Sequence, residues 1–420
     1  MLPSAAELVA RFLRTNGYTE TLKSFIKEAE LPLDTGAGSV SSVTIESILH
    51  EKKTFDLSVN FEKLGVEDGN REWAVPAPSK PTVLASLPSR SNILSVAAFN
   101  LQLPSSSSVK QYVAVTTADR QLHLLDPVSP SLELVHSYTS FQDSPILDLL
   151  TIGSRYLMIA SMSGKLLLYD TVSDQILDER KDHSKYVVKI ACWSDEDSVV
   201  VASAGWDSKV FLYRIHIGGG APRIGAPLST LSLTSIPETL LFVRSPEDGT
   251  PILLVARRDS TFLYYYSIPP VNASAFRLLG KQNLAPQSNA WVAFTPADVR
   301  LCPTDPSVVA VATSSTPHMK ILILRLLLPP KQRAETVDTV ESEAAEPVAL
   351  TQASQARAEL LIADREEAAI LVNVSTMAPQ TAYSTPRLTW RPDGTGLYVS
   401  SDDGVVRGVE ANSGKLIAST

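Results

Sequence analysis

The chain has 420 residues, a formal net charge of −8, and 44% hydrophobic against 20% charged residues. This length exceeds the roughly 100–200 residues of a typical domain, so we expect several domains or one large closed unit. The acidic balance argues against nucleic acid or an anionic membrane as partner, because binding phosphate groups requires an excess of Lys and Arg.

The cysteine content and the apolar runs indicate an intracellular protein. Cys192 and Cys302 both lie in apolar stretches and are too few for a disulfide framework or a zinc site, which fits the reducing cytoplasm or nucleus. The N-terminus lacks the charged start and apolar core of a secretory signal. The apolar run Ile321–Pro330 is too short to span a bilayer and contains Arg325.

Two short helices are expected at the N-terminus. Ser4–Glu7 has the spacing of a capping box, and Asn16-Gly17 is a typical helix end because glycine adopts the left-handed conformation easily. A second helix begins near Thr19 and ends at Leu31-Pro32. Isolated helices of this length are marginal in water. We therefore expect the hairpin to pack against a second copy or a neighbouring domain.

Residues Leu8–Leu31 resemble a lissencephaly-homology (LisH) module. The resemblance rests on Leu8, Phe12, Leu13, Gly17-Tyr18, Thr21, Phe25 and Glu28, while Leu22 departs from the small residue usual after Thr21. It implies a homodimer in which two such helix pairs pack together. The alternative is a helical hairpin that docks on the rest of its own chain. We expect the dimer interface to contain Leu8, Phe12, Leu13, Tyr18, Leu22, Phe25 and Ile26.

A third helix is expected near Thr44 and an extended piece over Leu57–Phe61. Because such a tail often follows LisH modules, the resemblance implies that the helical module extends over residues 1–65. The composition then changes. Val75–Pro81 is rich in proline, which favours an extended linker, predicted over residues 66–83. A β-rich repeat domain is expected over 84–420.

The most regular stretch of this domain is Asp182–Ile215. It predicts strands over Val187–Trp193, Ser198–Ser203 and Lys209–Ile215, with a tight turn at Ala204–Ser208. One such sheet cannot bury a core alone, so the unit should recur. Similar turn-and-strand stretches are found at Val115–Asp126, Ile159–Asp170, Val255–Tyr266 and Val399–Glu410. The turn residues Asp119, Ser163 and Asp207 are 44 residues apart, and Asp259 follows after 52. That period is typical of four-stranded propeller blades.

These repeats resemble the WD-repeat family from about Leu84 to the C-terminus. Asp182-His183 stands where the family has Gly-His, Tyr213-Arg214 where it has Trp-Asp, and Trp390–Gly394 is another familiar stretch. The resemblance implies an all-β propeller. Val308–Arg325 and Ala358–Val374 each suggest a further blade, so we expect about seven blades, with six or eight still possible.

Two features of the ring remain open in the sequence. The acidic stretch Arg333–Glu346 predicts a solvated insertion near residues 331–347, with a binding arm as the alternative. Closure of the ring requires either Gly414–Ser419 as the outer strand of the last blade or Thr82–Leu87 as a latch, because an open edge invites aggregation.

His183, Ser203 and Asp207 have the residue types of a hydrolytic triad. The family resemblance implies instead that they, with Tyr213, form hydrogen bonds within one blade. Ser203 lies in a predicted strand, where no sharp turn presents its hydroxyl. The remaining histidines lack ligand spacing, and there is no phosphate-binding loop. We therefore predict no catalytic residue, no metal and no cofactor.

The family resemblance also implies a binding face, where the residue before each turn Asp is exposed. Those positions are Ala118, Met162, Trp206, Arg258 and Asp402. Trp and Arg are enriched at interface hot spots. We therefore expect a partner-binding patch of Tyr186, Trp206, Arg257 and Arg258; alternatively, Trp206 covers its neighbouring blade.

Three functional hypotheses follow. The first is a non-enzymatic scaffold that dimerises through the LisH module and binds proteins or peptides on the propeller, with dimerisation raising its affinity for multivalent partners. The second is a substrate receptor of a ubiquitin ligase or a co-repressor subunit. The Trp-Asp-x-Arg motif of many cullin-ligase receptors is missing, since Tyr169–Val172 reads Tyr-Asp-Thr-Val. The third is a propeller hydrolase.

Overall fold

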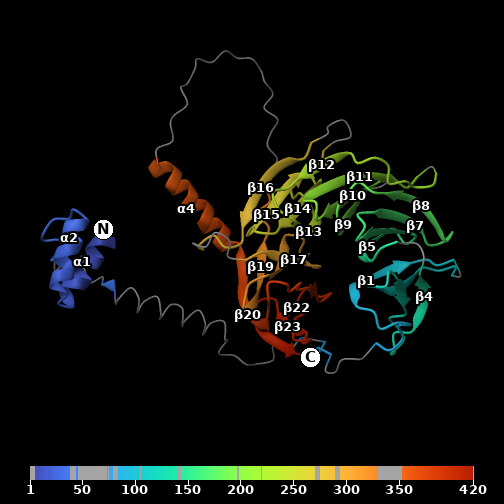
Figure 1. Cartoon of the computed structure of the whole chain (residues 1–420), viewed down its shortest axis with the longest axis horizontal. Helices are drawn as coiled ribbons and strands as arrows, with labels where there is room; N and C mark the ends of the chain where they lie inside the picture. Colours follow the sequence, from blue (N-terminus) through green and yellow to red (C-terminus); the bar gives the residue numbers. More distant parts are fainter. Residues whose placement is uncertain are drawn as a thin grey trace, which may run out of the picture. The chain divides into compact units, whose positions relative to one another are not determined.

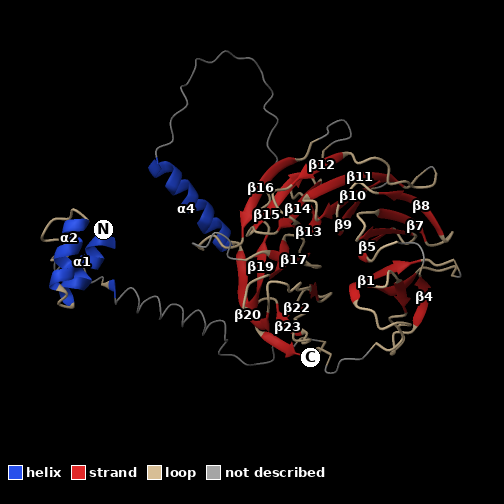
Figure 2. Ribbon diagram, viewed as in Figure 1, coloured by secondary structure: helices blue, strands red, loops and turns tan. Residues whose placement is uncertain are grey.

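The computed structural model describes residues 5–37, 44–45, 73, 75–78, 84–104, 106–139, 143–195, 198–218, 220–269, 275–288, 294–329 and 352–419. The chain forms two compact units, Met1–Glu72 and Trp73–Thr420. The first is helical and the second consists almost wholly of strands (Figure 2). Ser4, most of the expected third helix, the extended piece at 57–61 and the acidic insertion lie outside the described residues.

The helical unit is a hairpin of α1 (Ala5–Thr15) and α2 (Thr19–Glu28). Gly17, at the predicted turn, has a φ of +74°, which residues with a Cβ rarely adopt. Ala10, Leu22 and Ile26 are buried between the helices, with Leu13, Phe25 and Leu31 packed against them. Arg14 donates hydrogen bonds to the carbonyls of Leu33 and Thr35, so the chain after α2 folds back along α1.

The second unit contains six four-stranded antiparallel sheets around a central opening (Figure 1). Blade 1 consists of β1 (Ile93–Leu101), β2 (Lys110–Thr117), β3 (Leu122–Leu125) and β4 (Leu134–Tyr138). Blade 2 consists of β5 (Ile146–Ile152), β6 (Tyr156–Ser161), β7 (Leu166–Asp170) and β8 (Gln175–Arg180). Blade 3 consists of β9 (Val187–Ser194), β10 (Ser198–Gly205), β11 (Lys209–His216) and β12 (Ser229–Ser232).

The other three blades follow in chain order. Blade 4 consists of β13 (Pro237–Arg244), β14 (Pro251–Arg257), β15 (Phe262–Ser267) and β16 (Arg277–Asn283). Blade 5 consists of β17 (Pro296–Leu301), β18 (Val308–Thr313), β19 (His318–Arg325) and β20 (Ile370–Pro379). Blade 6 consists of β21 (Leu388–Trp390), β22 (Gly396–Val399), β23 (Arg407–Glu410) and β24 (Leu416–Ser419). The propeller fold and the three strands predicted for blade 3 are confirmed.

The expected number of about seven blades is wrong, because the described residues form six. Ala358–Val374 does not start a blade of its own: helix α4 (Gln352–Ala368) occupies most of it, and β20 after the helix is the outer strand of blade 5. The Ala, Glu, Leu and Arg residues of this stretch favour a helix. Glu366 accepts a hydrogen bond from the Asn283 amide (2.7 Å), which joins the end of α4 to blade 4.

The hydrophobic core of the propeller lies between the blades. Separate clusters of buried apolar side chains join blades 1 and 2, 2 and 3, 3 and 4, 4 and 5, and 5 and 6. The inner strands are also joined directly, since Asp148 of β5 accepts a hydrogen bond from the Ile190 amide of β9 (2.9 Å), and Asp298 of β17 accepts one from the Leu388 amide of β21 (3.0 Å). Each sheet is thus stabilised mainly by its neighbours.

The junction between blades 6 and 1 is built differently, around Trp73. Leu397 and Val399 pack against blade 5, so strand alternation places Gly396 and Tyr398 on the opposite face of blade 6. The Trp73 ring lies on that face, 6% exposed, with its centroid 5.4 Å from that of Tyr398. A Cβ at Gly396 would lie 2.4 Å from this ring, so the glycine makes room for the indole.

Further contacts connect the chain before β1 to both ends of the ring. Arg391 stacks on Trp73 (4.3 Å) and donates a hydrogen bond to the Val75 carbonyl (2.9 Å). On blade 1, Ser86 donates to the Leu132 carbonyl (2.7 Å) and Ser89 to the Asp119 carboxylate (2.7 Å). Of the two closures considered, the outer strand of blade 6 is β24, within Gly414–Ser419.

We expect Trp73→Ala to destabilise the propeller by about 3 kcal/mol, because it removes a buried aromatic side chain from this junction. Chemical denaturation of the full chain, followed by tryptophan fluorescence and circular dichroism, measures the change. Tyr383→Ala is the matched control, since the Tyr383 ring is fully accessible to solvent. Equal stability of Trp73→Ala and wild type would show that the junction does not depend on Trp73.

Candidate functional site

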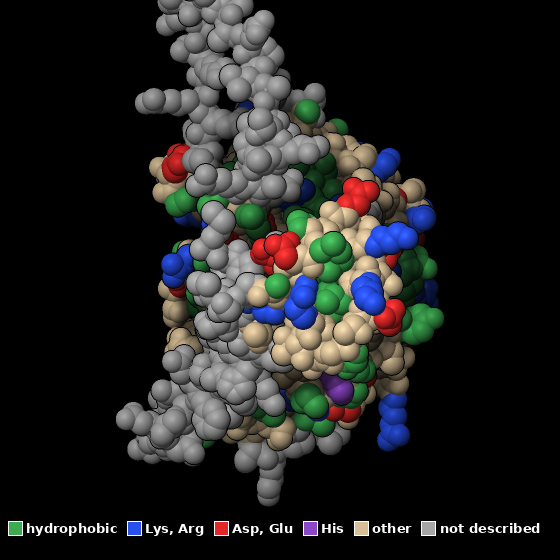
Figure 3. Space-filling view, turned by 90° about the vertical axis from the view of Figure 1, so that its left-hand side faces the viewer, with side chains coloured by type: hydrophobic (Ala, Val, Ile, Leu, Met, Phe, Trp, Pro, Cys, Tyr) green, Lys and Arg blue, Asp and Glu red, His purple; other side chains and the backbone are tan. Residues whose placement is uncertain are grey.

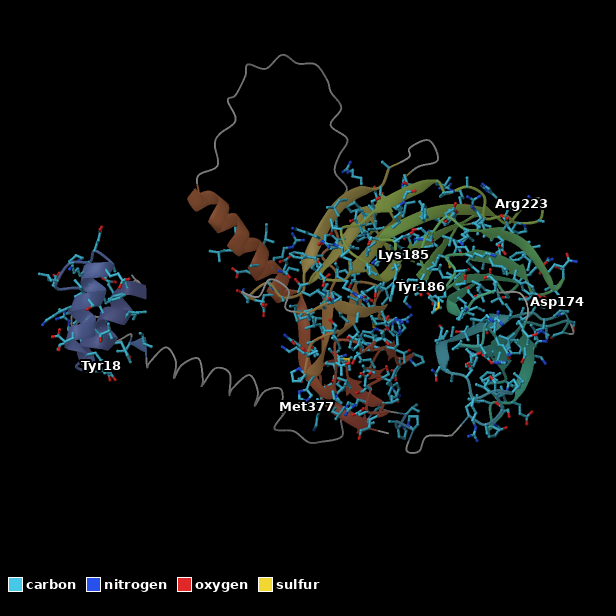
Figure 4. All side chains as sticks on the ribbon, viewed as in Figure 1. Tyr18, Asp174, Lys185, Tyr186, Arg223 and Met377 are labelled. Carbon is cyan, nitrogen blue, oxygen red and sulfur yellow. The ribbon has the colours of Figure 1, made fainter. Side chains whose placement is uncertain are left out.

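The structure brings three of the four residues of the predicted binding patch together. The rings of Tyr186 and Trp206 lie 5.3 Å apart, and the Arg258 guanidinium lies 5.9 Å from the Trp206 ring. Tyr186 is 38% and Trp206 39% exposed. Figure 4 shows Tyr186 and Lys185 on the inner side of the ring, whereas Asp174 and Arg223 lie at its outer edge. We call Tyr186, Trp206 and Arg258 the aromatic patch.

Equivalent positions in neighbouring blades explain why these side chains meet. The Trp206 amide donates to the Tyr186 carbonyl (2.9 Å), and the Arg258 amide donates to the Ile236 carbonyl (2.7 Å) in the same way. Each residue follows the second strand of its blade, so both side chains emerge at the same end of the ring. Arg258 is oriented by Glu238, whose Oε1 accepts a hydrogen bond from its Nε (2.6 Å).

Arg257 lies apart from the aromatic patch. Its guanidinium donates to Tyr264 Oη (2.7 Å) and Ser235 Oγ (3.0 Å), and it lies 4.8 Å from the Tyr264 ring. These three residues belong to blade 4 or the turn before it. Arg257 is the last residue of β14 and Arg258 the first residue after it, and their side chains have different partners.

Three of the four residues of the predicted blade network form a chain of hydrogen bonds, and Tyr213 is bonded beside it. His183 Nδ1 lies 3.0 Å from Asp207 Oδ1, and His183 Nε2 lies 2.8 Å from Ser203 Oγ. Tyr213 Oη donates to Asp182 (3.1 Å), next to His183. A Cβ at Gly205 would lie 2.4 Å from His183 Nδ1, so glycine at this position lets the ring approach the turn.

Burial governs the protonation of this network. It lowers the pKa of His183, against the opposing effect of the Asp207 carboxylate. For Asp207, burial acts to raise the pKa, but the hydrogen bonds from His183 and from the Ser184 and Lys209 amides lower it overall. The neutral imidazole and the carboxylate are therefore the forms that the fold favours.

The solvent exposure of His183 and Ser203 decides whether they can react with a substrate. The Ser203 hydroxyl is fully buried and the His183 ring nearly so. A serine nucleophile must reach a substrate carbonyl, and neither side chain is open to one. A role for the network in orienting the turn that carries Trp206 stays our prediction.

The predicted dimerisation residues differ in their exposure in the single chain. Leu22 and Ile26 are buried within the hairpin, while Leu8, Phe12, Leu13 and Phe25 are partly covered. Tyr18 is 53% exposed, with its ring 6.3 Å from that of Phe12 (labelled in Figure 4). A groove of about 520 Å³ runs along α2 and the residues after it, and Leu22, Ile26, Leu31 and Leu33 contribute its apolar lining.

A second candidate site, which the sequence analysis missed, is a cleft of about 820 Å³ between blades 1 and 6 that extends along the inner strands β5, β9 and β17 of blades 2, 3 and 5. We call it the junction cleft. Ile93, Val96 and Val406 form part of its walls, and Lys189, Arg300 and Arg387 contribute cationic groups. Burial, together with the positive charges of Arg387 and Arg300, lowers the pKa of Lys189, while Asp148 and Asp298 oppose the shift. The available signal was the presence of charged residues inside inner strands, Lys189 in β9 and Asp298 and Arg300 in β17.

On the side seen in Figure 3, basic and acidic side chains of the described residues are interspersed with apolar ones. Within the described part of the chain, no group of three or more His, Cys, Asp or Glu side chains is arranged to hold a metal ion. No described helix is long and apolar enough to cross a bilayer.

Comparison with known protein families gives two matches. The model described as "UCP007778, LisH domain" matches residues 6–35, and "UCP007778, beta-propeller domain" matches residues 70–417. These matches confirm the predicted combination of a LisH module with a propeller. Among curated proteins, none matches the chain. Among solved structures, the chain is similar to that of Saccharomyces cerevisiae Sqt1, with 12% identity over 79% of this chain and 75% of that chain, and a TM-score of 0.49.

The buried His183 makes the stability of the propeller depend on pH. Because its pKa is lowered on folding, the unfolded chain binds a proton more readily, so stability present above about pH 6.5 is lost as the pH falls through that value. We expect denaturation midpoints measured from about pH 7.5 to 5 to fall more steeply in wild type than in His183→Gln. The pH dependence that is left in His183→Gln would come from His123, because burial lowers the pKa of that side chain as well. His216→Gln, at an exposed position, serves as control; equal slopes in His183→Gln and wild type would contradict the assignment.

Proposed function

Since the chain belongs to the UCP007778 family, whose models join a LisH domain to a propeller, we propose that it is a non-enzymatic scaffold for protein–protein interactions. In this proposal the LisH modules pair two chains, and the aromatic patch of each propeller binds a protein or peptide. The observation that carries it is the contrast within blade 3. Trp206 is exposed to solvent in the turn after β10. His183 and Ser203, which are hydrogen-bonded to each other beside this turn, are buried and cannot contact a substrate.

The chemistry of the aromatic patch supports binding of a protein. Tyr and Trp offer large contact areas with few rotatable bonds, and Arg258 adds hydrogen-bond donors over the indole face. Because Glu238 already fixes the Arg258 side chain, little conformational entropy is lost when a partner binds there. The exposed part of the patch is therefore pre-organised for a partner.

Dimerisation is supported by the shape of the helical unit. In the described residues, α1 and α2 are short and enclose a small core, and an apolar groove runs along α2. Packing against a second hairpin would cover Leu31, Phe25 and Phe12, which one chain covers only in part. Pairing would present two aromatic patches to one multivalent partner.

We expect the full chain to be a dimer and Phe25→Asp to be a monomer, because an ionised carboxylate in place of this partly buried ring opposes burial of the hairpin surface. Light scattering coupled to size-exclusion chromatography gives the mass of each. Val128→Asp introduces the same charge on an exposed loop of the propeller and should remain dimeric. A wild-type chain that stays monomeric at high concentration would refute the dimer.

We expect Trp206→Ser to weaken partner binding by about 2 kcal/mol, roughly 30-fold, with little change in the melting temperature. Quantitative affinity capture from a cell lysate compares wild type, Trp206→Ser, Arg258→Ser and the exposed control Val128→Ser. Partners lost with both patch variants and kept by the control are those that bind the patch. A fall in melting temperature without any loss of captured protein would show instead that Trp206 covers its neighbouring blade.

A further inference from the structure

The junction cleft has apolar walls that the ring leaves uncovered. Val96, in β1, is 60% exposed. Ile93, in the same strand, and Val406, in the loop before β23, are also exposed. The other inner strands begin with buried residues, such as Ile146 and Val187, because a neighbouring blade packs against them. Exposed apolar side chains that line a concave surface are typical of interaction sites.

The same cleft carries more positive than negative charge. The Arg300 Nε and Arg387 Nη1 atoms lie 3.3 and 3.9 Å from the carboxylate of Asp298, which they share. Both arginine side chains are half exposed, so part of each guanidinium faces solvent. Lys189 Nζ lies 3.9 Å from Asp148 Oδ2, beyond hydrogen-bond distance. Two half-exposed guanidinium groups thus share one carboxylate, with the Lys189 amine nearby, which favours an added negative charge.

We propose that the junction cleft binds an extended segment of a partner protein in which a carboxylate side chain is flanked by apolar residues. Its carboxylate would lie against Arg300, Arg387 and Lys189, and its apolar side chains against Ile93, Val96 and Val406. A small inorganic anion would satisfy the cations and leave the apolar walls exposed, whereas such a segment covers both. The proposal deepens the scaffold function on which it rests, because it adds a second binding surface and states its chemistry.

The test uses fluorescein-labelled nine-residue peptides with Asp or Glu at the centre and Leu, Ile or Val two positions to either side. Matched peptides carry Asn or Gln at the centre, or Ser at the flanking positions. Fluorescence anisotropy with the full chain measures their affinities. We expect saturable binding of acid-centred peptides, at least tenfold tighter than of either matched set, and weakened by added salt.

Variants of the cleft wall locate the binding site. Val96→Asp, at an exposed position, should fold normally and weaken binding at least tenfold, because it removes apolar contact and repels the carboxylate. Val96→Ser should weaken it less. Val128→Asp, with the same charge elsewhere on blade 1, should bind as wild type does, and so should Trp206→Ser. Melting curves verify that each variant is folded.

Three peptide-binding results would each overturn the proposal. They are no binding by any acid-centred peptide, equal binding by Gln-centred peptides, and unchanged binding by a folded Val96→Asp variant. Binding of tripolyphosphate that depends on Arg387, without peptide binding, would show a simple anion site and would also overturn it. Capture of partners through Trp206 is measured in a separate experiment, so the proposal for one surface can be refuted while the proposal for the other is supported.

Discussion

The constraint on which the propeller depends is that each sheet must have both of its faces covered. A four-stranded sheet of this size cannot bury a core alone, and five junctions are filled by apolar clusters contributed by adjacent blades. The sixth junction, where the ring begins and ends, uses the chain before β1 instead. Trp73 lies on blade 6, and Ser86 and Ser89 are bonded to blade 1.

This arrangement has a consequence for function. Because the sixth junction is filled by a short segment and not by facing sheets, blades 1 and 6 contribute exposed apolar side chains to the junction cleft. The segment that fills it directly follows the helical unit in the chain. The junction between blades 6 and 1, which differs most from the others, is therefore also where exposed apolar side chains lie close to cationic groups.

Blade 3 illustrates how one set of residues can suggest two functions. His183, Ser203 and Asp207 are hydrogen-bonded in the order of a hydrolytic triad, yet the His183 and Ser203 side chains are closed to solvent. Their bonds join the strand before Trp206 to the turn after it. The exposed chemistry lies beside the network, where Trp206 meets Tyr186 and, from the next blade, Arg258.

The sequence by itself determined the LisH hairpin, the propeller class and the strands of blade 3, because these follow from local signals: glycine at a helix end, apolar periodicity and a regular repeat. It also placed Trp206 and Arg258 at equivalent turns. Only the tertiary structure decided the number of blades, since α4 and β20 are joined to blade 5 across a long insertion. It likewise decided the role of Trp73, which lies more than 300 residues from its partners Arg391 and Tyr398. Lys189, Arg300 and Arg387 converge for the same reason, because closing a ring brings together residues from different repeats that no local pattern connects.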